Sequence, residues 1–377
     1  MLPILAYRSS SSGIATFTYE LSKALASVGY NILLPAWGLS KNAATTLKEK
    51  GVDVINLGDD IPELGYIGGP IFEYFLLSNS LKRLLKRKGA TEAKAIFTIP
   101  GFALSFNNVF ASKGWAFEGL LHAMQTGLRY LPIMLRVPGA IASVEYWLMD
   151  NKIFRKTKYI LCITSSSSYK FNLTKYGSKV VYLTPPIELR HKPQEPSRKL
   201  RLLFVSRDLA IPRKGLVTLL KALVNVDVRL LQNIKLTLVG RNWEYFRVYI
   251  DYLRQKGLEV RATGFIDRSL MTEIYRDSDV LVYPSYHEEF GYAILEAMAH
   301  GLAIVASDIP SFRDMVVNGR NGFLIKPGDF SAIGRSISRL IEDRELLYQM
   351  KTESLKIVEN KFNPKLTART LEKLLNE

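Results

Sequence analysis

Two glutamates in the C-terminal half have a spacing that could serve chemistry. Glu288 and Glu296 lie where a predicted strand ends at Pro284 and a predicted helix begins near Gly291. The free N–H groups at a helix N-terminus attract anions such as phosphate. A carboxylate directly before such a helix would repel a phosphate. Glu288 is therefore useful there only if it faces neutral hydroxyls, such as those of a sugar.

Glu296 stands in a predicted helix that is otherwise apolar. A buried carboxylate needs hydrogen-bond donors, and the two hydroxyls of a ribose would supply them. A second interpretation is structural, because Tyr292, Glu296 and His300 recur every four residues and would form one solvated stripe on the helix. The residues alone leave both interpretations open.

Two cations follow the first predicted strand of the C-terminal half. Arg207 lies just after the strand predicted for residues 201–206, and Lys214 precedes Gly215 at the start of the next predicted helix. Cations in such a place could neutralise a diphosphate. A single arginine or lysine is more often an ordinary exposed cation, so their position alone does not assign a role.

Together these residues resemble the signature of the retaining glycosyltransferases of the large family-four type, the glycosyl transferases group 1. That signature is a glutamate, seven residues and a second glutamate, with Phe-Gly after the first. The matching residues here are Glu288, Phe290, Gly291 and Glu296. Glu289 departs mildly, since a small residue or proline is commoner there. The resemblance is strong over residues 201–341 and weak in the N-terminal half.

The resemblance implies roles for the matched residues. Glu288 would bind hydroxyls of the donor sugar, and Glu296 would bind the ribose of the nucleotide. Arg207 and Lys214 would neutralise the donor diphosphate. The backbone amides near Phe290 and Gly291 would approach the sugar and the phosphate.

Three glycines and one lysine complete the comparison with that family. Gly240 and Gly264 match the ends of the next two strands, and Gly240 is included among the donor-binding positions. Gly13 resembles the family's glycine loop, although a serine loop that caps a helix explains it equally well. Lys113 stands where many relatives have a histidine, so the sequence leaves open whether Lys113 takes over its contact with the sugar.

The resemblance also implies a fold and a mechanism. The expected fold class is α/β with GT-B architecture, in which two Rossmann-like domains face each other across a deep cleft. The donor would be a nucleotide-diphosphate sugar, and the acceptor would be a hydroxyl of a glycan, a glycolipid or a lipid-linked saccharide. We expect no metal and no cofactor, because no Asp-x-Asp motif stands in a convincing loop. Arg207, Lys214 and the helix dipole would then stabilise the leaving diphosphate.

The expected elements fit two α/β domains, because apolar strands alternate with helices in both halves. We expect an N-terminal acceptor domain over residues 1–185, a linker over 186–199 and a donor domain over 200–360. A C-terminal helix over 361–377 would cross back to the N-terminal domain. Ser311 and Asp314 form the pattern of a helix capping box.

Composition narrows the class of protein. The chain has 377 residues, 47% of them hydrophobic, and a formal net charge of +16. The single cysteine, Cys162, is expected to be a buried hydrophobe, which suits a cytoplasmic location. No signal peptide and no membrane-spanning stretch is expected. The net charge favours an anionic partner.

One segment could bring the protein to a membrane. Apolar and aromatic residues from Tyr66 to Leu77 precede a basic cluster of Lys82, Arg83, Lys86, Arg87 and Lys88. This combination suits an anionic membrane surface. A core helix followed by a solvated basic turn is the other interpretation.

Three other functions remain open from the residues. A nucleotide-sugar epimerase of the same fold would not require an acceptor. A basic nucleic-acid-binding protein would explain the charge, but no binding motif is recognisable and no nucleic-acid partner is expected. A dehydrogenase would need a Gly-x-Gly-x-x-Gly after the first strand, which is absent.

Overall fold

The structure is a computed structural model of the whole chain. It describes residues 7–8, 13–37, 39–56, 95–97, 109–112, 159–163, 180–190, 194–266, 268–288 and 290–376. The aromatic and basic run of residues 66–88 lies outside these residues, as does Lys113. The described residues contain no helix that is long and apolar enough to cross a membrane.

The chain divides into two compact units. The first contains residues 1–186 together with the C-terminal residues 364–377, and the second contains residues 187–363. Between Leu183 and Leu200 the described residues form neither a helix nor a strand. Part of this segment is bonded to the second unit, because the N–H of Ile187 donates to the carbonyl of Phe362 at 2.9 Å and that of Arg190 to Ala299 at 3.0 Å.

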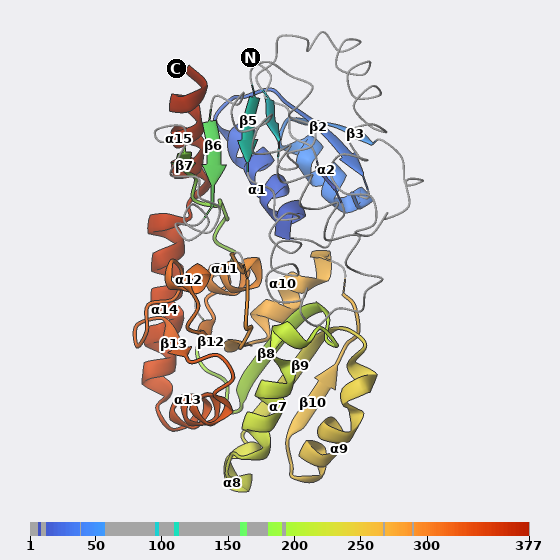
Figure 1. The fold of residues 1–377 in the computed structure, drawn as a ribbon, viewed down its shortest axis with the longest axis vertical. Coiled ribbons are helices and arrows are strands. Elements are labelled where there is room, and N and C mark those ends of the chain that lie inside the picture. The colour runs from blue at the N-terminus through green and yellow to red at the C-terminus, as the bar shows by residue number, and fades with distance from the viewer. Residues whose placement is uncertain are drawn as a thin grey trace, which may run out of the picture. The chain divides into compact units, whose positions relative to one another are not determined.

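The first unit contains parallel strands and helices (Figure 1). Strands β1, β2 and β3 form one group of neighbours, and β4, β5, β6 and β7 form another. Their bounds are β1 Tyr7–Arg8, β2 Ile32–Trp37, β3 Val52–Asn56, β4 Ala95–Phe97, β5 Val109–Ser112, β6 Tyr159–Cys162 and β7 Val180–Tyr182. The helices are α1 Gly13–Ser27, α2 Lys41–Glu49 and the C-terminal α15 Pro364–Asn376.

Helix α15 packs against α1 within the first unit. Ala368 and Leu371 of α15 are fully buried, as are Phe17 and Leu21 of α1. The hydroxyl of Thr367 donates to the carbonyl of Thr184 at 2.7 Å. The amphipathic end of the chain is therefore tied to the first unit by apolar burial and by a side-chain hydrogen bond.

The second unit is built on a six-stranded parallel sheet in the order β10-β9-β8-β11-β12-β13. The strands are β8 Leu200–Asp208, β9 Ile234–Arg241, β10 Glu259–Ala262, β11 Val280–Tyr283, β12 Ala303–Ser307 and β13 Gly322–Ile325. Three strands run outward in one direction from β8 and three in the other from β11. This is the strand order of a doubly wound Rossmann fold, whose ligands bind where the order reverses.

Helices cover both faces of this sheet (Figure 1). They are α7 Leu216–Val224, α8 Val228–Leu231, α9 Arg247–Gln255, α10 Arg268–Arg276, α11 Tyr292–Ala299, α12 Pro310–Arg313, α13 Phe330–Glu342 and α14 Arg344–Lys361, with short 3₁₀ turns η5 Pro212–Lys214 and η6 Trp243–Phe246. Leu202 and Phe204 pack in one core cluster with α7, α9 and α13. The alternate residue Leu203 is equally buried and faces the other side.

A buried ion cluster closes the amino-terminal edge of the sheet. The carboxylate of Asp279, just before β11, is fully buried. It accepts hydrogen bonds from the guanidinium of Arg201 at 3.0 Å and from the ammonium of Lys351 on α14 at 2.8 Å. Although burial alone would raise it, these cations hold the pKa of Asp279 below its ordinary value. The cluster ties β8, β11 and α14 together.

The strand expected over residues 201–206 and the strand ends expected at Gly240, Gly264 and Pro284 are confirmed within two residues. Strands β5 and β13 were not expected from the sequence. The capping box is wrong, since Ile309 caps α12 and has no side-chain hydrogen bond. The hydroxyl of Ser311 instead donates to the carbonyl of Glu288 at 2.7 Å.

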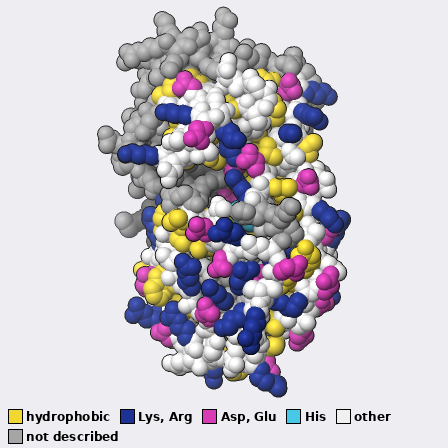
Figure 2. Space-filling model, turned by 180° about the vertical axis from the view of Figure 1, so that it is seen from behind, with side chains coloured by type: hydrophobic (Ala, Val, Ile, Leu, Met, Phe, Trp, Pro, Cys, Tyr) yellow, Lys and Arg dark blue, Asp and Glu magenta, His cyan; other side chains and the backbone are white. Residues whose placement is uncertain are grey.

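Basic side chains are spread widely over the second unit. On the face shown in Figure 2, Lys and Arg side chains cover much of its lower part, with Asp and Glu side chains among them. Several acids of the second unit are in ion pairs, including Asp251 with Arg254 at 3.2 Å and Glu259 with Lys199 at 3.4 Å.

Candidate active site

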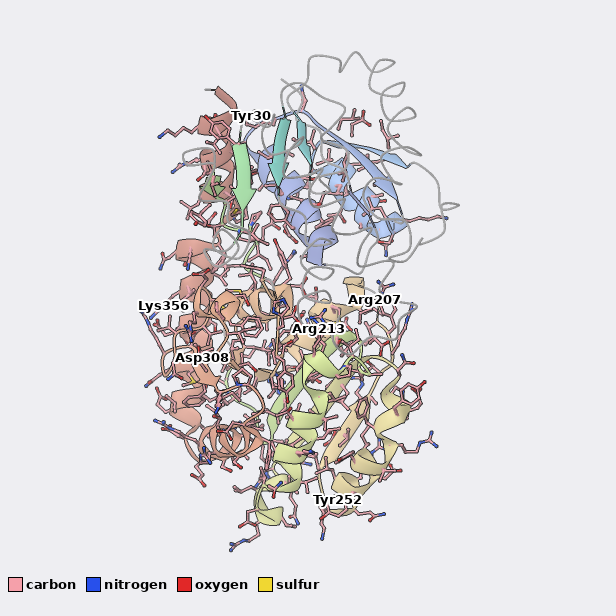
Figure 3. All side chains as sticks on the ribbon, in the orientation of Figure 1. Tyr30, Arg207, Arg213, Tyr252, Asp308 and Lys356 are labelled. Carbon is pink, nitrogen blue, oxygen red and sulfur yellow. The ribbon has the colours of Figure 1, made fainter. Side chains whose placement is uncertain are left out.

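The candidate site lies at the carboxyl ends of β8 and β11, where the strand order of the second unit reverses. Arg207 is next to last in β8, and η5 carries Lys214. Tyr283 ends β11, and the loop that follows carries Glu288. Figure 3 shows Arg207 and Arg213 at this end of the unit. Residues 74 positions apart in the sequence therefore meet at one edge of the sheet.

A glycine allows the two loops to approach each other closely. Gly215 has φ of 78°, and a Cβ there would lie 2.1 Å from the carbonyl oxygen of Pro284. The hydroxyl of Ser285 donates to the carbonyl of Arg213 at 2.9 Å across the same contact. Any other residue at 215 would push the loop after β8 away from the loop after β11, and with it Lys214 away from Glu288.

Glu288 is the centre of the site. Its side chain is 9% exposed, and Oε1 accepts a hydrogen bond from the ammonium of Lys214. The same oxygen accepts from the hydroxyl of Ser285 at 3.0 Å, from that of Tyr283 at 3.2 Å and from the guanidinium of Arg213 at 3.4 Å. Among the residues that the structure describes, every side-chain donor to Glu288 reaches Oε1. None of these donors reaches Oε2.

The charges of this cluster are mutually stabilised. Burial alone would raise the pKa of Glu288, but Lys214 and Arg213 hold it below its ordinary value. Burial alone would lower the pKa of Lys214, but Tyr283 and Glu288 raise it above its ordinary value. Burial and the carboxylate of Glu288 raise the pKa of Tyr283 to about 12. At neutral pH the cluster therefore holds a carboxylate, an ammonium and a neutral phenol.

Glu296 is held by a tyrosine that the sequence analysis did not single out. Its Oε2 accepts a hydrogen bond from the hydroxyl of Tyr275 at 3.0 Å. The ring of Tyr275 stacks on that of His300 at 4.8 Å, and Nδ1 of His300 lies 2.7 Å from the carbonyl of Glu296. Tyr292 and His300 are buried at 5% and 8% exposure. The solvated stripe is therefore wrong, and Glu296 is the most accessible of its three residues.

Helix α11 begins beside Glu288, and its N-cap position requires a glycine. Gly291 caps the helix in the left-handed region with φ of 85°, and a Cβ there would lie 2.6 Å from the ring of Phe312. Phe290 is 1% exposed and packs against the rings of Tyr292 and Phe362. Its side chain is thus a core anchor, so only its backbone is placed to meet a ligand.

The remaining expected positions are placed as follows. Arg207 is exposed in β8. Gly240, in β9, has φ of 148°, and a Cβ there would lie 2.1 Å from the carbonyl of Ser206, so glycine keeps β9 and the end of β8 together. Gly13 is the first residue of α1 in the first unit. Lys113 lies outside the described residues.

Sequence reasoning missed four residues of the site: Tyr283, Arg213, Ser285 and Tyr275. Tyr283 could have been found, because a tyrosine that ends a buried strand beside a carboxylate needs a partner for its hydroxyl. Arg213 directly precedes Lys214. Tyr275 precedes β11 and reaches Glu296 only through the packing of α10, which no local pattern reveals.

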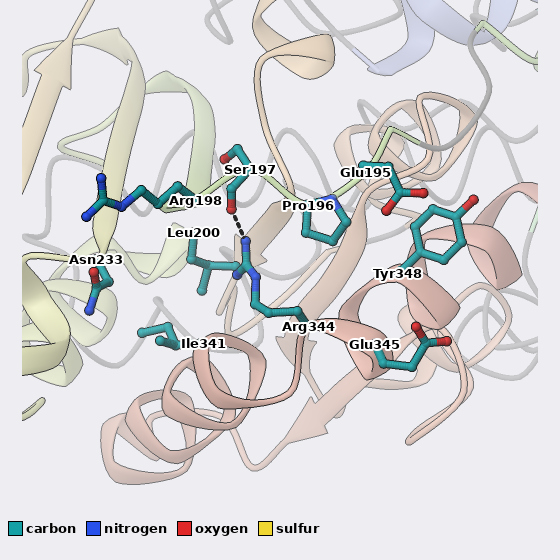
Figure 4. A pocket seen from close by; sticks show the side chains of 10 residues that line it. All are labelled: Glu195, Pro196, Ser197, Arg198, Leu200, Asn233, Ile341, Arg344, Glu345 and Tyr348. Carbon is teal, nitrogen blue, oxygen red and sulfur yellow. Dashed lines mark hydrogen bonds between the residues drawn. The ribbon is translucent and has the colours of Figure 1, made fainter.

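A separate cavity of about 500 Å³ lies at the opposite, amino-terminal edge of the same sheet. Ser197, Asn233 and Arg344 are among its lining residues (Figure 4). The guanidinium of Arg344 donates to the carbonyls of Ser197 and Leu340. None of the site residues lines this cavity. Within the described residues there is also no group of three or more His, Cys, Asp or Glu side chains that could hold a metal ion.

Comparison with known proteins decides the family. Residues 187–356 match the family model described as glycosyl transferases group 1. The second unit belongs to this family. This unit is called the group 1 unit below. The matched residues include Glu288 and Glu296, so the expected likeness to the glycosyl transferases group 1 is confirmed.

Two curated relatives align with part of the chain. The capsular polysaccharide biosynthesis glycosyltransferase CapM of Staphylococcus aureus is 35% identical over 27% of this chain and 27% of its own. The phosphatidyl-myo-inositol mannosyltransferase of Mycolicibacterium smegmatis is 32% identical over 36% of this chain and 34% of its own. The chain thus spans about a third or less of the length of these relatives.

Solved structures are similar to this chain over its whole length, and HepE of Anabaena is an example. HepE of Anabaena, in complex with UDP and glucose, is 18% identical and has a TM-score of 0.64, covering 100% of this chain and 99% of its own. The likeness confirms the expected fold class, the GT-B fold with two Rossmann-like α/β domains. The group 1 unit is the second of these domains.

Proposed function

We propose that this protein is a retaining glycosyltransferase that moves a sugar from a nucleotide-diphosphate sugar to a hydroxyl acceptor. The observation that carries the proposal is the Lys214–Glu288 pair at the switch point of the group 1 unit. It places a fixed cation and a hydroxyl-accepting carboxylate side by side, which is what a sugar diphosphate requires. The complex of HepE with UDP and glucose is in keeping with such a donor.

The cations act on the leaving group. As the bond between the anomeric carbon and the phosphate oxygen breaks, negative charge grows on the diphosphate. Lys214, Arg207 and the N–H groups that begin α11 would stabilise this charge, because preorganised donors act strongly in a site of low dielectric. In the proposed mechanism, Lys214, Arg207 and the N–H groups of α11 stabilise the diphosphate without a metal ion.

The two glutamates hold opposite ends of the donor. Oε2 of Glu288 would accept hydrogen bonds from hydroxyls of the sugar, and Glu296 would bind the diol of the ribose. Tyr275 orients Glu296 for this task. Gly240 and Gly291 let the backbone approach the nucleotide without a Cβ in the way.

The proton of the acceptor hydroxyl would be taken up by the leaving diphosphate. Glu288 is held as an anion by Lys214, so it is not available as a general acid. The acceptor oxygen would bond to the anomeric carbon on the face from which the diphosphate leaves. Bond formation on that face retains the anomeric configuration. The proton of the acceptor would pass to the departing phosphate oxygen as the bond between this oxygen and the anomeric carbon breaks.

The acceptor is proposed to be a saccharide or a lipid-linked saccharide at an anionic membrane surface. One relative is named for capsular polysaccharide biosynthesis and another as a phosphatidyl-myo-inositol mannosyltransferase, which is in keeping with such an acceptor. The net charge of +16 suits an anionic surface. Co-sedimentation with anionic vesicles at low salt should occur and should weaken when residues 82, 83, 86, 87 and 88 become glutamine. Protein that stays in the supernatant at low salt would remove the membrane from the proposal.

A transfer assay tests the function itself. The full chain is incubated with UDP-, GDP- and ADP-sugars and with saccharide and lipid-linked acceptors, and products are identified by mass spectrometry and by the ¹H coupling of the new anomeric centre. An α-linked donor should give an α-linked product, and Glu288→Gln should abolish it. An epimerised nucleotide sugar without acceptor would support the epimerase instead.

A further inference from the structure

Tyr283 lies between the two charged groups of the site. Its hydroxyl is 3.0 Å from the ammonium of Lys214 and 3.2 Å from Oε1 of Glu288. The side chain is 3% exposed, and its ring lies 5.8 Å from that of Phe312. The phenol is therefore fixed in place by strand β11 on one side and by an aromatic contact on the other.

The direction of these hydrogen bonds follows from the chemistry of the groups. An ammonium can only donate and an ionised carboxylate can only accept. Lys214 therefore donates to the phenol oxygen, and the single proton of Tyr283 is directed at Glu288. Burial and the neighbouring carboxylate raise the pKa of Tyr283 to about 12, so this proton stays on the phenol at neutral pH.

Donor binding would disturb the balance of this cluster. A diphosphate attracts Lys214, and if the ammonium turns toward it, the buried carboxylate of Glu288 loses its closest cation. Arg213 is a weaker substitute, since it is 45% exposed and 3.4 Å away. Ser285 has one proton and three acceptors within 3.2 Å: Arg213, His287 and Glu288. Of these donors, Tyr283 is the one whose only proton is directed at Glu288.

We propose that Tyr283 is a positioning residue, which keeps Glu288 ionised and directed at the donor sugar while Lys214 turns from Glu288 to the diphosphate. This inference rests on the proposed function. The inference adds that the sugar-binding carboxylate is oriented by a residue that contacts neither the sugar nor the phosphate. Phenylalanine at 283 would keep the ring and its packing and remove only the hydroxyl.

Steady-state kinetics of Tyr283→Phe test the first half of this proposal. The kcat of Tyr283→Phe should fall about tenfold, the loss expected for one hydrogen bond to a charged group. The KM for the donor should change little, since Glu296 and the cations are intact. Tyr252→Phe, an exposed tyrosine at a distant position labelled in Figure 3, is the matched control and should behave as the wild type. Wild-type kcat in Tyr283→Phe would overturn the proposal.

A titration tests the second half and does not need activity. The carboxyl ¹³C signal of Glu288, assigned by its loss in Glu288→Gln, should titrate at higher pH in Tyr283→Phe than in the wild type, with nucleoside diphosphate present. An unchanged titration would refute the positioning role even if the transferase reaction is established. Conversely, absence of transfer by the wild-type protein would remove the proposed function, whereas the titration would still decide whether Tyr283 controls Glu288.

Discussion

Lys214 and Glu288 form a buried ion pair although 74 positions separate them in the sequence. The pair forms because β8 and β11 are adjacent at the switch point of the sheet and because Gly215 lets their loops touch. A cation and a carboxylate that satisfy each other can be separated by a ligand that offers a phosphate to one and hydroxyls to the other. The pair is thus suited to recognise a sugar diphosphate.

Substitution of Glu296 and substitution of Glu288 should have different effects on binding and catalysis. Glu296→Ala should weaken binding of the nucleoside diphosphate roughly ten- to hundredfold, because it removes charge-assisted hydrogen bonds to the ribose. Glu288→Ala should leave nucleoside diphosphate binding nearly intact and lower kcat, since the sugar is no longer held. Titration calorimetry and initial rates separate the two effects. The exposed Glu342→Ala is the control, and wild-type values in both glutamate variants would defeat the site assignment.

The cations should act without a metal ion. Lys214→Ala and Arg207→Ala should each lower kcat, because each removes positive charge from the leaving diphosphate. Lys221→Ala, an exposed lysine of α7, serves as the control and should not lower kcat. Treatment with EDTA should leave the rate unchanged. Activity that is lost with EDTA and restored by magnesium or manganese would contradict the metal-free mechanism.

The ion pair should also give stability a defined dependence on pH. The pKa of Glu288 is lowered in the fold, so its contribution is present above its unfolded value of about 4.3 and is lost as pH falls. The pKa of Lys214 is raised, so its contribution is present below about 10.4 and is lost as pH rises through the raised value. Lys214→Met should therefore destabilise by about 1–3 kcal/mol near pH 7.

Thermal unfolding of Lys214→Met and wild type across pH provides the measurement. The difference between their midpoints should be largest between about pH 5 and pH 10. It should shrink as the pH falls from the unfolded value of about 4.3 toward the lowered pKa of Glu288 in the fold. A difference that is constant over the whole range would mean that Lys214 stabilises by packing of its aliphatic chain and not by its charge.

The buried ion cluster at the other edge of the sheet should be essential for folding. Asp279→Asn leaves the 2%-exposed ammonium of Lys351 without a counter-charge, and it leaves Arg201 with only the exposed carboxylate of Asp277. Removal of one partner from a buried ion pair costs about 3–5 kcal/mol. Asp251→Asn is the matched control, since its pair with Arg254 is exposed and contributes at most about 1 kcal/mol. Equal unfolding midpoints for Asp279→Asn and wild type would contradict the cluster's role.

Much of the second unit could be predicted because its strands are continuous apolar runs. The strand that ends near Ser206 and the helix that begins after Gly291 follow from local pattern alone. The contacts of Glu288 could not be predicted in this way. They depend on which strands become neighbours and on a close approach at Gly215, both of which are properties of the packed sheet.

The same limit explains the errors at single residues. Ser311 has the spacing of a capping box, but its hydroxyl finds a nearer acceptor in the carbonyl of Glu288 from another loop. Tyr292 and His300 have the spacing of an exposed stripe, but α11 is covered on nearly all sides, and α14 is among the elements that it contacts. In both places a tertiary contact overrides a pattern that would be sufficient in an isolated helix.

Binding of the donor nucleotide is the central claim, and a thermal-shift panel tests it most directly. The full chain is heated with UDP, GDP, ADP and the corresponding nucleotide sugars. A ligand at 100 times its dissociation constant should stabilise the protein by about 2.7 kcal/mol. At least one nucleotide should raise the unfolding midpoint of the wild type, and Glu296→Ala should lose most of that rise. If no nucleotide or nucleotide sugar raises the midpoint of the wild type, the site does not bind a nucleotide and the account is wrong.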